Sequence, residues 1–164
     1  MITQELVKEL FTYKNGQLIR TMQVSGSKHQ KGHAVGSFTA DGYLTVRING
    51  ESNYCHRLIF LYHFGYLPKE IDHINGVRND NRIENLRECT RSQNRYNAKK
   101  RSNSSSKYKG VCWGKKKRLW HAYITVNSRL MNLGDFWDEE VASQVVSVER
   151  LKHHGAFANY DSEG

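Results

Sequence analysis

The stretch Ile71–Asn94 reads IDHINGVRNDNRIENLRECTRSQN and sets an Asp-His pair among an unusual number of asparagines. Asparagine is a poor former of both helix and strand, so its density here needs another reason. IDHI is short and β-branched at both ends, and NG is a favoured turn. Thr90 and Gln93 have the spacing of a capping box. The stretch therefore predicts a strand, a turn, a polar loop and a helix that begins near Arg91 and runs into YNAKKR.

Three side chains of this stretch offer the groups that hydrolysis of a phosphodiester requires. The reaction needs a base to deprotonate water and a divalent cation to stabilise the charged oxygens. Asp72 and Asn94 supply a carboxylate and an amide oxygen, which suit a hard cation such as Mg²⁺. His73 points away from Asp72 in an extended segment, so base and ligand need not compete for one position. We expect the strand-loop-helix unit to bring Asp72 and Asn94 to a common centre.

The positive charge of the chain is concentrated in one block. The formal net charge is +9, and twelve of the 25 Lys and Arg residues lie between Arg87 and Arg118, where Glu88 is the single acid. Tyrosine and tryptophan are interleaved with this charge, which is typical of a nucleic-acid-binding surface. The alternative is a solvated basic linker.

Other classes of protein are disfavoured by composition. The 164 residues contain no apolar run long enough to span a membrane, and MITQELVKELF lacks the basic start and apolar stretch of a secretion signal. The three cysteines form no CxxC pair, which argues against a zinc site or a disulfide framework. We expect a soluble intracellular protein.

The first half of the chain is predicted to be rich in β-hairpins. Asn15-Gly16, Asp41-Gly42 and Asn49-Gly50 are turn dipeptides, and the last separates the alternating segment YLTVRI from ESNYC. His56–Gly65, HRLIFLYHFG, has apolar residues at helical spacing and ends on glycine. It predicts a short buried helix after a small sheet.

The second half begins after SNSSS, which has no apolar residue and is expected to be a linker. YKGVCW, LWHAYITV and RLMNLGDF then predict three strands, and Asp138 and Gly155 mark the start and end of a helix. In the middle strand Trp120, Ala122, Ile124 and Val126 share one face. We expect this face to pack on a helix surface formed by Val141, Ala142, Val145 and Val148.

DHINGVRNDNRIENLRECTRSQN resembles the HNH endonuclease motif, in the variety found in phage-encoded and intron-encoded homing endonucleases, over residues 10–97. The resemblance implies that His73 is the general base and that Asn85 braces it through the backbone. It also implies that Asp72 and Asn94 hold one Mg²⁺, with Mn²⁺ able to substitute. The implied products carry a 5′-phosphate and a 3′-hydroxyl. The implied setting is the cytoplasm of a phage-infected bacterium.

Residues 107–160 resemble a second family, the ethylene-response-factor type of DNA-binding domain of plants, through YKGVCW, WHAYI, LGDF, DEEVAS and HGAFANY. The resemblance implies that a sheet face contacts double-stranded DNA. Few arginines are present in this half: Cys112, Tyr123 and Thr125 stand where side chains that read bases or contact phosphates are expected, which favours positioning over sequence reading. The predicted DNA contacts are Arg91, Arg95, Lys99, Lys100, Lys109, Trp113, Lys115, Lys116, Lys117, Arg118, His121, Tyr123, Thr125 and Arg129.

Together these patterns predict an α+β protein of two domains. Residues 1–101 form the nuclease domain with its ββα-metal core at 54–101, residues 102–107 the linker, and residues 108–160 a three-stranded antiparallel sheet packed on one helix. A non-catalytic DNA binder on a degenerate HNH scaffold is the competing hypothesis, and a nuclease directed at RNA is a third. No protein partner is required, and the sequence leaves monomer and dimer open.

The remaining polar residues receive less specific interpretations. Asn75, Asn79 and Asn81 are expected to be turn or capping residues. Asn97 is expected at the surface or in contact with a phosphate, and His56 is either a partner of the site or a DNA contact. The other histidines are expected to be structural: His29, His33, His63, His153 and His154.

Overall fold

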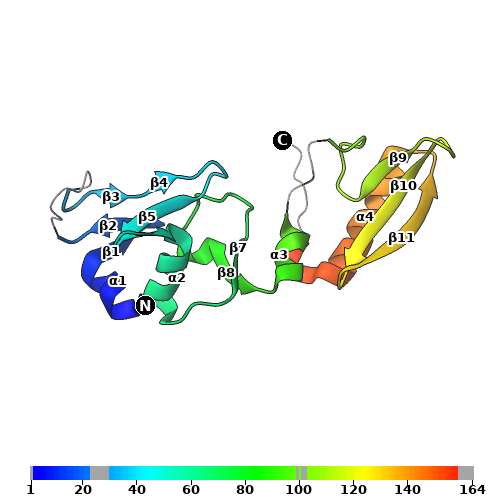
Figure 1. Cartoon of the computed structure of the whole chain (residues 1–164). Coiled ribbons are helices and arrows are strands. Elements are labelled where there is room, and N and C mark those ends of the chain that lie inside the picture. Colours follow the sequence, from blue (N-terminus) through cyan, green and yellow to red (C-terminus); the bar gives the residue numbers. More distant parts are fainter. Residues whose placement is uncertain (1, 23–29, 99, 101–102, 159–164) are drawn as a thin grey trace. The chain divides into compact units, whose positions relative to one another are not determined.

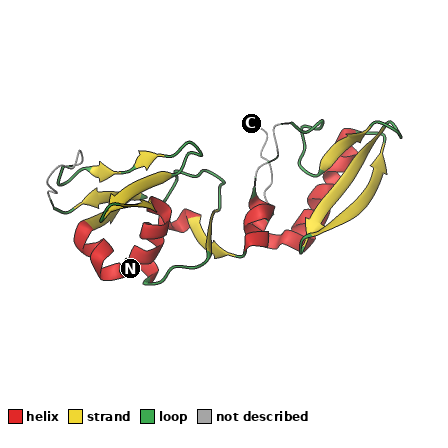
Figure 2. Ribbon diagram, viewed as in Figure 1, coloured by secondary structure: helices red, strands yellow, loops and turns green. Residues whose placement is uncertain are grey.

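The structure, a computed structural model, describes residues 2–22, 30–98, 100 and 103–158 (Figure 1). The chain forms two compact units, Met1–Cys89 and Thr90–Gly164, and each is described by itself. Both contain helices and small antiparallel sheets, so the predicted α+β class is confirmed (Figure 2). The domain boundary predicted at 102–107 stays a prediction. No helix within the described ranges is long and apolar enough to cross a membrane.

Among its described residues the N-terminal unit forms three antiparallel sheets, in the orders β1-β2-β3, β4-β5-β6 and β7-β8. Two longer helices and one short 3₁₀ turn accompany them. The elements are α1 Gln4–Leu10, β1 Phe11–Lys14, β2 Gln17–Arg20, β3 Ala34–Val35, β4 Ser37–Phe38, β5 Leu44–Ile48, β6 Glu51–Tyr54, α2 Cys55–Phe64, β7 Glu70–His73, η1 Ile83–Asn85 and β8 Leu86–Cys89.

Local signals account for most of these elements. The predicted Asn15-Gly16 and Asn49-Gly50 turns join β1 to β2 and β5 to β6, with positive φ at both residues of each pair. Helix α2 ends at Gly65, which adopts the left-handed conformation and donates its N–H to the carbonyl of Leu61, as predicted. Helix α1 is a short helix that buries Val7 and was not predicted.

One hydrophobic core connects the sheets of this unit to both helices. Val7, Phe11, Leu18 and Ile59 are at most 1% exposed, and the core extends to the strands β7 and β8. Burying a side chain of this kind contributes about 1.5–3 kcal/mol. The Asp-His pair therefore lies on strand β7, which is held in place by the core.

The C-terminal unit contains the sheet β11-β10-β9, which packs on helix α4 as predicted (Figure 2). Helix α3 begins with the predicted capping box, in which Thr90 and Gln93 exchange two hydrogen bonds, and it ends at Asn97, inside the predicted YNAKKR stretch. The elements are α3 Arg91–Asn97, β9 Val111–Gly114, β10 Leu119–Val126, β11 Arg129–Phe136, α4 Glu139–His154 and η2 Gly155–Phe157.

The helix face that meets this sheet differs from the prediction. Ala142 and Val146 are buried, whereas Val141 is 46% and Val148 is 65% exposed. The predicted face was therefore wrong at both valines. Ala142 and Val146 belong to the same buried cluster as Ala122 and Ile124 of β10, so packing on the sheet selects this face of the helix.

The serines that were expected to lie in a linker make contacts inside this unit. Ser106 is 2% exposed, and its hydroxyl donates to the Glu139 carboxylate over 2.6 Å. The hydroxyl of Ser105 accepts the N–H of Trp113 over 2.8 Å. These bonds attach the described part of the segment to β9 and to the start of α4.

Candidate active site

The register of β7 and β8 places Arg87 directly opposite Asp72. Arg87 donates to Oδ2 of Asp72 from Nε over 2.8 Å and lies 2.6 Å from the same oxygen through Nη2. The Asp72 side chain is only 5% exposed and that of Arg87 17%. A carboxylate this buried requires a charged partner, so Arg87 both neutralises and orients Asp72.

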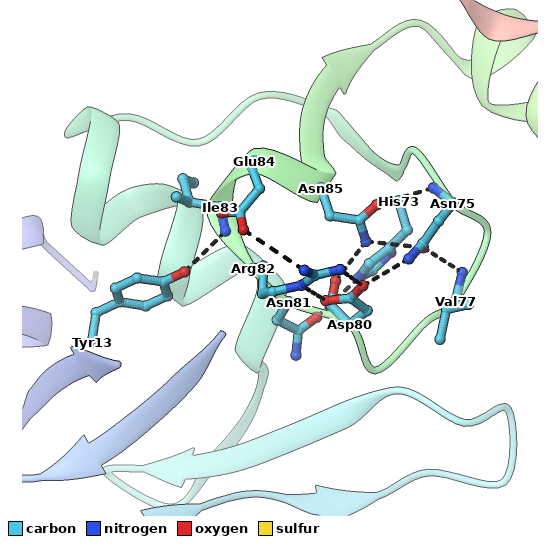
Figure 3. Close-up of polar contacts among 10 residues, drawn as sticks. All are labelled: Tyr13, His73, Asn75, Val77, Asp80, Asn81, Arg82, Ile83, Glu84 and Asn85. Carbon is cyan, nitrogen blue, oxygen red and sulfur yellow. Dashed lines mark hydrogen bonds and ion pairs between the residues drawn. The ribbon is translucent and has the colours of Figure 1, made fainter. Parts of the chain in front are cut away.

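His73 is also buried, with 5% of its surface exposed. Its Nε2 lies 2.9 Å from Oδ1 of Asn81, and Figure 3 shows the pair inside the loop. An amide oxygen only accepts, so Nε2 carries the hydrogen and Nδ1 is the basic nitrogen of the neutral ring. Burial lowers the pKa of His73, against raising contributions from Asn81, Asp72 and Asp80. The neutral form, which can accept a proton, is thus favoured.

A second histidine lies against the first. The His56 ring is centred 5.2 Å from that of His73 in an edge-to-face arrangement, and the Tyr43 ring is centred 6.0 Å from His73. Burial, with a smaller contribution from His73, lowers the pKa of His56 to about 3. His56 is only 8% exposed, so its position favours a partner of the site over a DNA contact.

The loop between β7 and β8 is closed by a network around Asn85 (Figure 3). Oδ1 of Asn85 accepts the N–H of Asn75 over 3.0 Å, and its Nδ2 donates to Oδ1 of Asn75 and to the carbonyl of Asp80. The carbonyl of Asn85 accepts the N–H of Ile74 over 2.9 Å, next to His73. Asp80 in turn accepts from Asn75 and from Arg82. The bracing role assigned to Asn85 stays a prediction.

The prediction for Asn81 as a turn or capping residue was wrong. Asn81 is 2% exposed and its amide faces His73, whereas Asn75 accepts the N–H of Val77 as a turn residue does. A Cβ added at Gly16 would lie 3.0 Å from the backbone carbon of Asn81, so the β1-β2 turn packs against this loop. That packing is not visible in the local sequence.

The expected second metal ligand, Asn94, lies on α3 in the C-terminal unit, whereas Asp72 lies in the N-terminal unit. Their convergence on one cation stays a prediction. Within the described part of the chain no three His, Cys, Asp or Glu side chains are grouped to hold a metal. A site of one carboxylate and one amide needs no such group. A carboxylate has about four lone-pair sites, so bonding to Arg87 does not exhaust Asp72, and the donor set fits a Mg²⁺-class ion.

Two of the predicted DNA-contacting cations have partners within the C-terminal unit. Lys109 donates to the carbonyls of Tyr96, over 2.8 Å, and of Ala98. Lys117 pairs with Asp135 over 2.6 Å, and His121 pairs with the same carboxylate.

The other predicted DNA contacts differ in exposure. Lys100, Tyr123 and Thr125 are half-buried, Trp113 is 36% exposed, and Lys99 lies outside the described residues. Asn97 is buried, so its expected surface position was wrong. The exposed members are Arg91, Arg95, Lys115, Lys116, Arg118 and Arg129.

Comparison with known proteins supports the first of the two resemblances. Residues 53–96 match the family model described as HNH endonuclease, and this segment contains Asp72, His73, Asn85 and Asn94. The chain is similar to Protein 3.8 of Escherichia phage T7, with 29% identity over 100 residues, which are 58% of this chain and 80% of that protein. No match to a solved structure was found. None of these comparisons supports the likeness to the plant DNA-binding domain.

Proposed function

We propose that the protein is a metal-dependent HNH endonuclease of the homing type that hydrolyses a phosphodiester of double-stranded DNA. The observation that carries this proposal is the arrangement of His73, whose Nε2 is hydrogen bonded to Asn81 inside the segment that matches the HNH model. That bond leaves Nδ1 as the nitrogen that accepts a proton.

In this proposal neutral His73 removes a proton from the attacking water. The imidazolium that forms keeps its hydrogen bond from Nε2 to Asn81, and the carboxylates of Asp72 and Asp80 favour the positive charge. Because burial lowers the pKa of His73, the base stays deprotonated at neutral pH. Cleavage then rises with pH through the pKa of His73 and levels off above it. Asn85 holds the loop that follows the base.

Asp72 and Asn94 are the residues that would hold the divalent ion, Mg²⁺ or Mn²⁺. When bound, such an ion stabilises the negative charge on the phosphate and on the leaving 3′-oxygen. Arg87 pairs with the Asp72 carboxylate and fixes its direction. The products would be a 5′-phosphate and a 3′-hydroxyl.

The C-terminal unit would dock the DNA through its cations, because eleven of the 25 Lys and Arg residues lie between Arg91 and Arg118. The homing role and the setting in a phage-infected bacterium follow from the resemblance of the motif. A relative encoded by a phage agrees with that setting.

A plasmid-nicking assay tests this function. The wild type should convert supercoiled DNA to the nicked or linear form with Mg²⁺ or Mn²⁺ and lose this activity with a chelator. His73→Ala should lower the rate roughly 100- to 10,000-fold, and His33→Ala, which alters an exposed histidine of the same unit, should leave it unchanged.

The competing function, a DNA binder without catalysis, gives the opposite result. It is favoured by the neutral amide of Asn94, which is a weaker ligand than a charged or imidazole side chain. A wild type that retards the plasmid on a gel but leaves it supercoiled with every divalent ion would refute the nuclease.

A further inference from the structure

Arg78 lies in the loop between β7 and β8, shortly after His73, and it is exposed. Two contacts hold its guanidinium in place. Nη1 donates to the carbonyl of Asp41 over 2.8 Å, and the guanidinium carbon lies 5.0 Å from the centre of the Tyr43 ring. A cation over the face of an aromatic ring is attracted by the quadrupole of that ring. An exposed arginine thereby acquires a defined position.

The turn between β4 and β5 supplies both contacts, and it is itself closed by hydrogen bonds. The carbonyl of Thr39 accepts the N–H of Gly42 over 2.9 Å, and the Thr39 N–H donates to the carbonyl of Tyr43 over 2.8 Å. The hydroxyl of Thr39 also accepts the N–H of Tyr43 over 3.1 Å. Arg78 is therefore held against a second piece of ordered backbone.

Tyr43 brings the arginine into the cluster around the proposed base. Its ring is centred 6.0 Å from that of His73 and 5.4 Å from that of His56. Burial is the main cause of the lowered pKa of His73, and the charge of Arg78 acts in the same direction. The field of the guanidinium thus reaches the place where the proposed chemistry occurs.

The partners of Arg78 differ from those of the two other arginines of this region. Arg82 faces Asp80 at 2.7 Å, and Arg87 faces Asp72 at 2.6 Å. Among the described residues no carboxylate is paired with Arg78. A carbonyl and a ring fix the cation without a formal charge. A guanidinium has five N–H donors, so its hydrogen bond to the carbonyl leaves donors for an anion.

We propose that Arg78 is a phosphate-binding residue of the N-terminal unit and donates to a non-bridging oxygen of the phosphodiester that is cut. This role rests on the proposed nuclease function, which places that phosphate beside His73. Attack by water adds negative charge to the phosphate oxygens, and a cation already in position stabilises that charge without rearrangement. The planar guanidinium also matches the geometry of phosphate oxygens. Tyr43 is a positioning residue, because it acts through Arg78.

Single-turnover cleavage of plasmid DNA by the full chain, with Mg²⁺ and saturating protein, tests this role. Arg78→Gln should lower the rate roughly 100-fold, because the stabilising charge is lost. The glutamine amide can still donate to the carbonyl of Asp41, so this loss reports the charge. Arg78→Lys keeps the charge and should lower the rate less than about ten-fold.

Arg47 provides the matched control. It is an exposed arginine on β5, the strand that follows Tyr43. A residue four positions further along an extended strand lies about 14 Å away, so Arg47→Gln removes the same charge at a distance from the base. It should change the saturated rate less than about two-fold. Affinity for duplex DNA in a chelator should differ less than about three-fold between Arg78→Gln and the wild type, because Arg78 acts mainly on the transition state.

A second pair of variants tests the positioning by Tyr43. Tyr43→Phe keeps the ring and should cleave at the wild-type rate within about two-fold, whereas Tyr43→Leu should be roughly ten-fold slower. Because Tyr43 also contacts two histidines, the double variant is needed. In the Tyr43→Leu background Arg78→Gln should lower the rate only roughly ten-fold further, which shows that the two residues act together.

Three results would overturn the proposal: a saturated rate of Arg78→Gln within about three-fold of the wild type, equal losses in Arg78→Lys and Arg78→Gln, or an equal loss in Arg47→Gln. Thermal unfolding shows that each variant is folded. A wild type that does not cleave refutes the nuclease and this role with it. Cleavage by the wild type and by Arg78→Gln at the same rate refutes the role of Arg78 alone, so the two failures are distinct.

Discussion

The polar loop of the N-terminal unit, at Arg82 and Arg87, and the surroundings of α3 in the C-terminal unit hold their cations with different kinds of partner. In the first, Arg87 faces Asp72 at 2.6 Å and Arg82 faces Asp80 at 2.7 Å. In the second, Lys109 and Arg150 face a backbone carbonyl. An ion pair balances the charge and fixes the direction of both side chains, whereas a backbone carbonyl fixes a cation without adding a formal charge.

The largest expected effect comes from breaking the balanced pair in the N-terminal unit. Arg87→Met leaves the Asp72 carboxylate buried without its partner, and it should lower the free energy of unfolding by about 3–5 kcal/mol. Arg82→Met removes an arginine whose side chain is 53% exposed, and it should cost less than about 1 kcal/mol. Urea unfolding measures both, and equal losses would contradict the role given to burial.

The pH dependence of stability probes the buried histidine beside the base. The pKa of His56 is about 3 in the folded chain and ordinary in the unfolded chain, so the unfolded state binds more protons between these values. Stability should therefore be complete above pH 6.5, the ordinary value, and fall as the pH decreases. Between pH 7 and pH 5 the loss from this residue should be about 2 kcal/mol.

His56→Phe should flatten this dependence, because it keeps an aromatic ring and removes the titrating group. His33→Gln, at an exposed histidine, should leave the dependence as it is. The measurement is the free energy of unfolding in urea at several pH values. An unchanged slope in His56→Phe would mean that other groups dominate the acid response.

The next expected effect is on the cleavage rate, and it comes from the hydrogen bond between His73 and Asn81. Asn81→Ala removes the acceptor at His73 Nε2, and leaving that buried group unsatisfied costs about 1–3 kcal/mol. The cleavage rate should fall roughly 10- to 100-fold while affinity for DNA stays constant. Asn79→Ala alters an exposed asparagine of the same loop and should leave the rate unchanged. Equal cleavage rates in the two variants would show that Asn81 has no role in the reaction.

The smallest expected effect is on the salt dependence of DNA binding, and it compares two lysines of the C-terminal unit. Lys115 is exposed, whereas Lys117 is paired with Asp135 over 2.6 Å. Lys115→Gln should reduce the slope of log affinity against log salt for duplex DNA by about 0.9, the value for one phosphate contact. Lys117→Gln should reduce it less, because Asp135 already offsets that charge. Binding titrations at several salt concentrations give the slopes.

The elements with local signals were predictable from the sequence. The Asn-Gly turns, the capping box at Thr90 and the N-cap at Asp138 each satisfy backbone groups within a few residues. Long-range packing was not predictable in the same way. Helix α4 carries two adjacent apolar stripes, and only contact with the sheet selects Ala142 and Val146 over Val141 and Val148.

The residues of the candidate site also fall into two groups, those that were predictable from the sequence and those that were not. Asp72 and His73 could be singled out because an Asp-His pair in an asparagine-rich loop is chemically unusual. Arg87 and Asn81 could not, because one depends on the register of β7 and β8 and the other on the folding of the loop. Asn79 and Asn81 lie two residues apart, on either side of Asp80, and the local sequence gives no reason to treat them differently. Burial alone distinguishes them.

The turn at Gly16 bears on how small a working fragment of this protein can be. Tyr13 accepts the N–H of Ile83, as Figure 3 shows, and Gly16 presses on the backbone at Asn81 and Arg82. Both residues precede the segment 53–96 that matches the family model. A fragment cut to that segment would lack the residues that pack against the loop between β7 and β8, so we expect the minimal folding piece to begin before Tyr13.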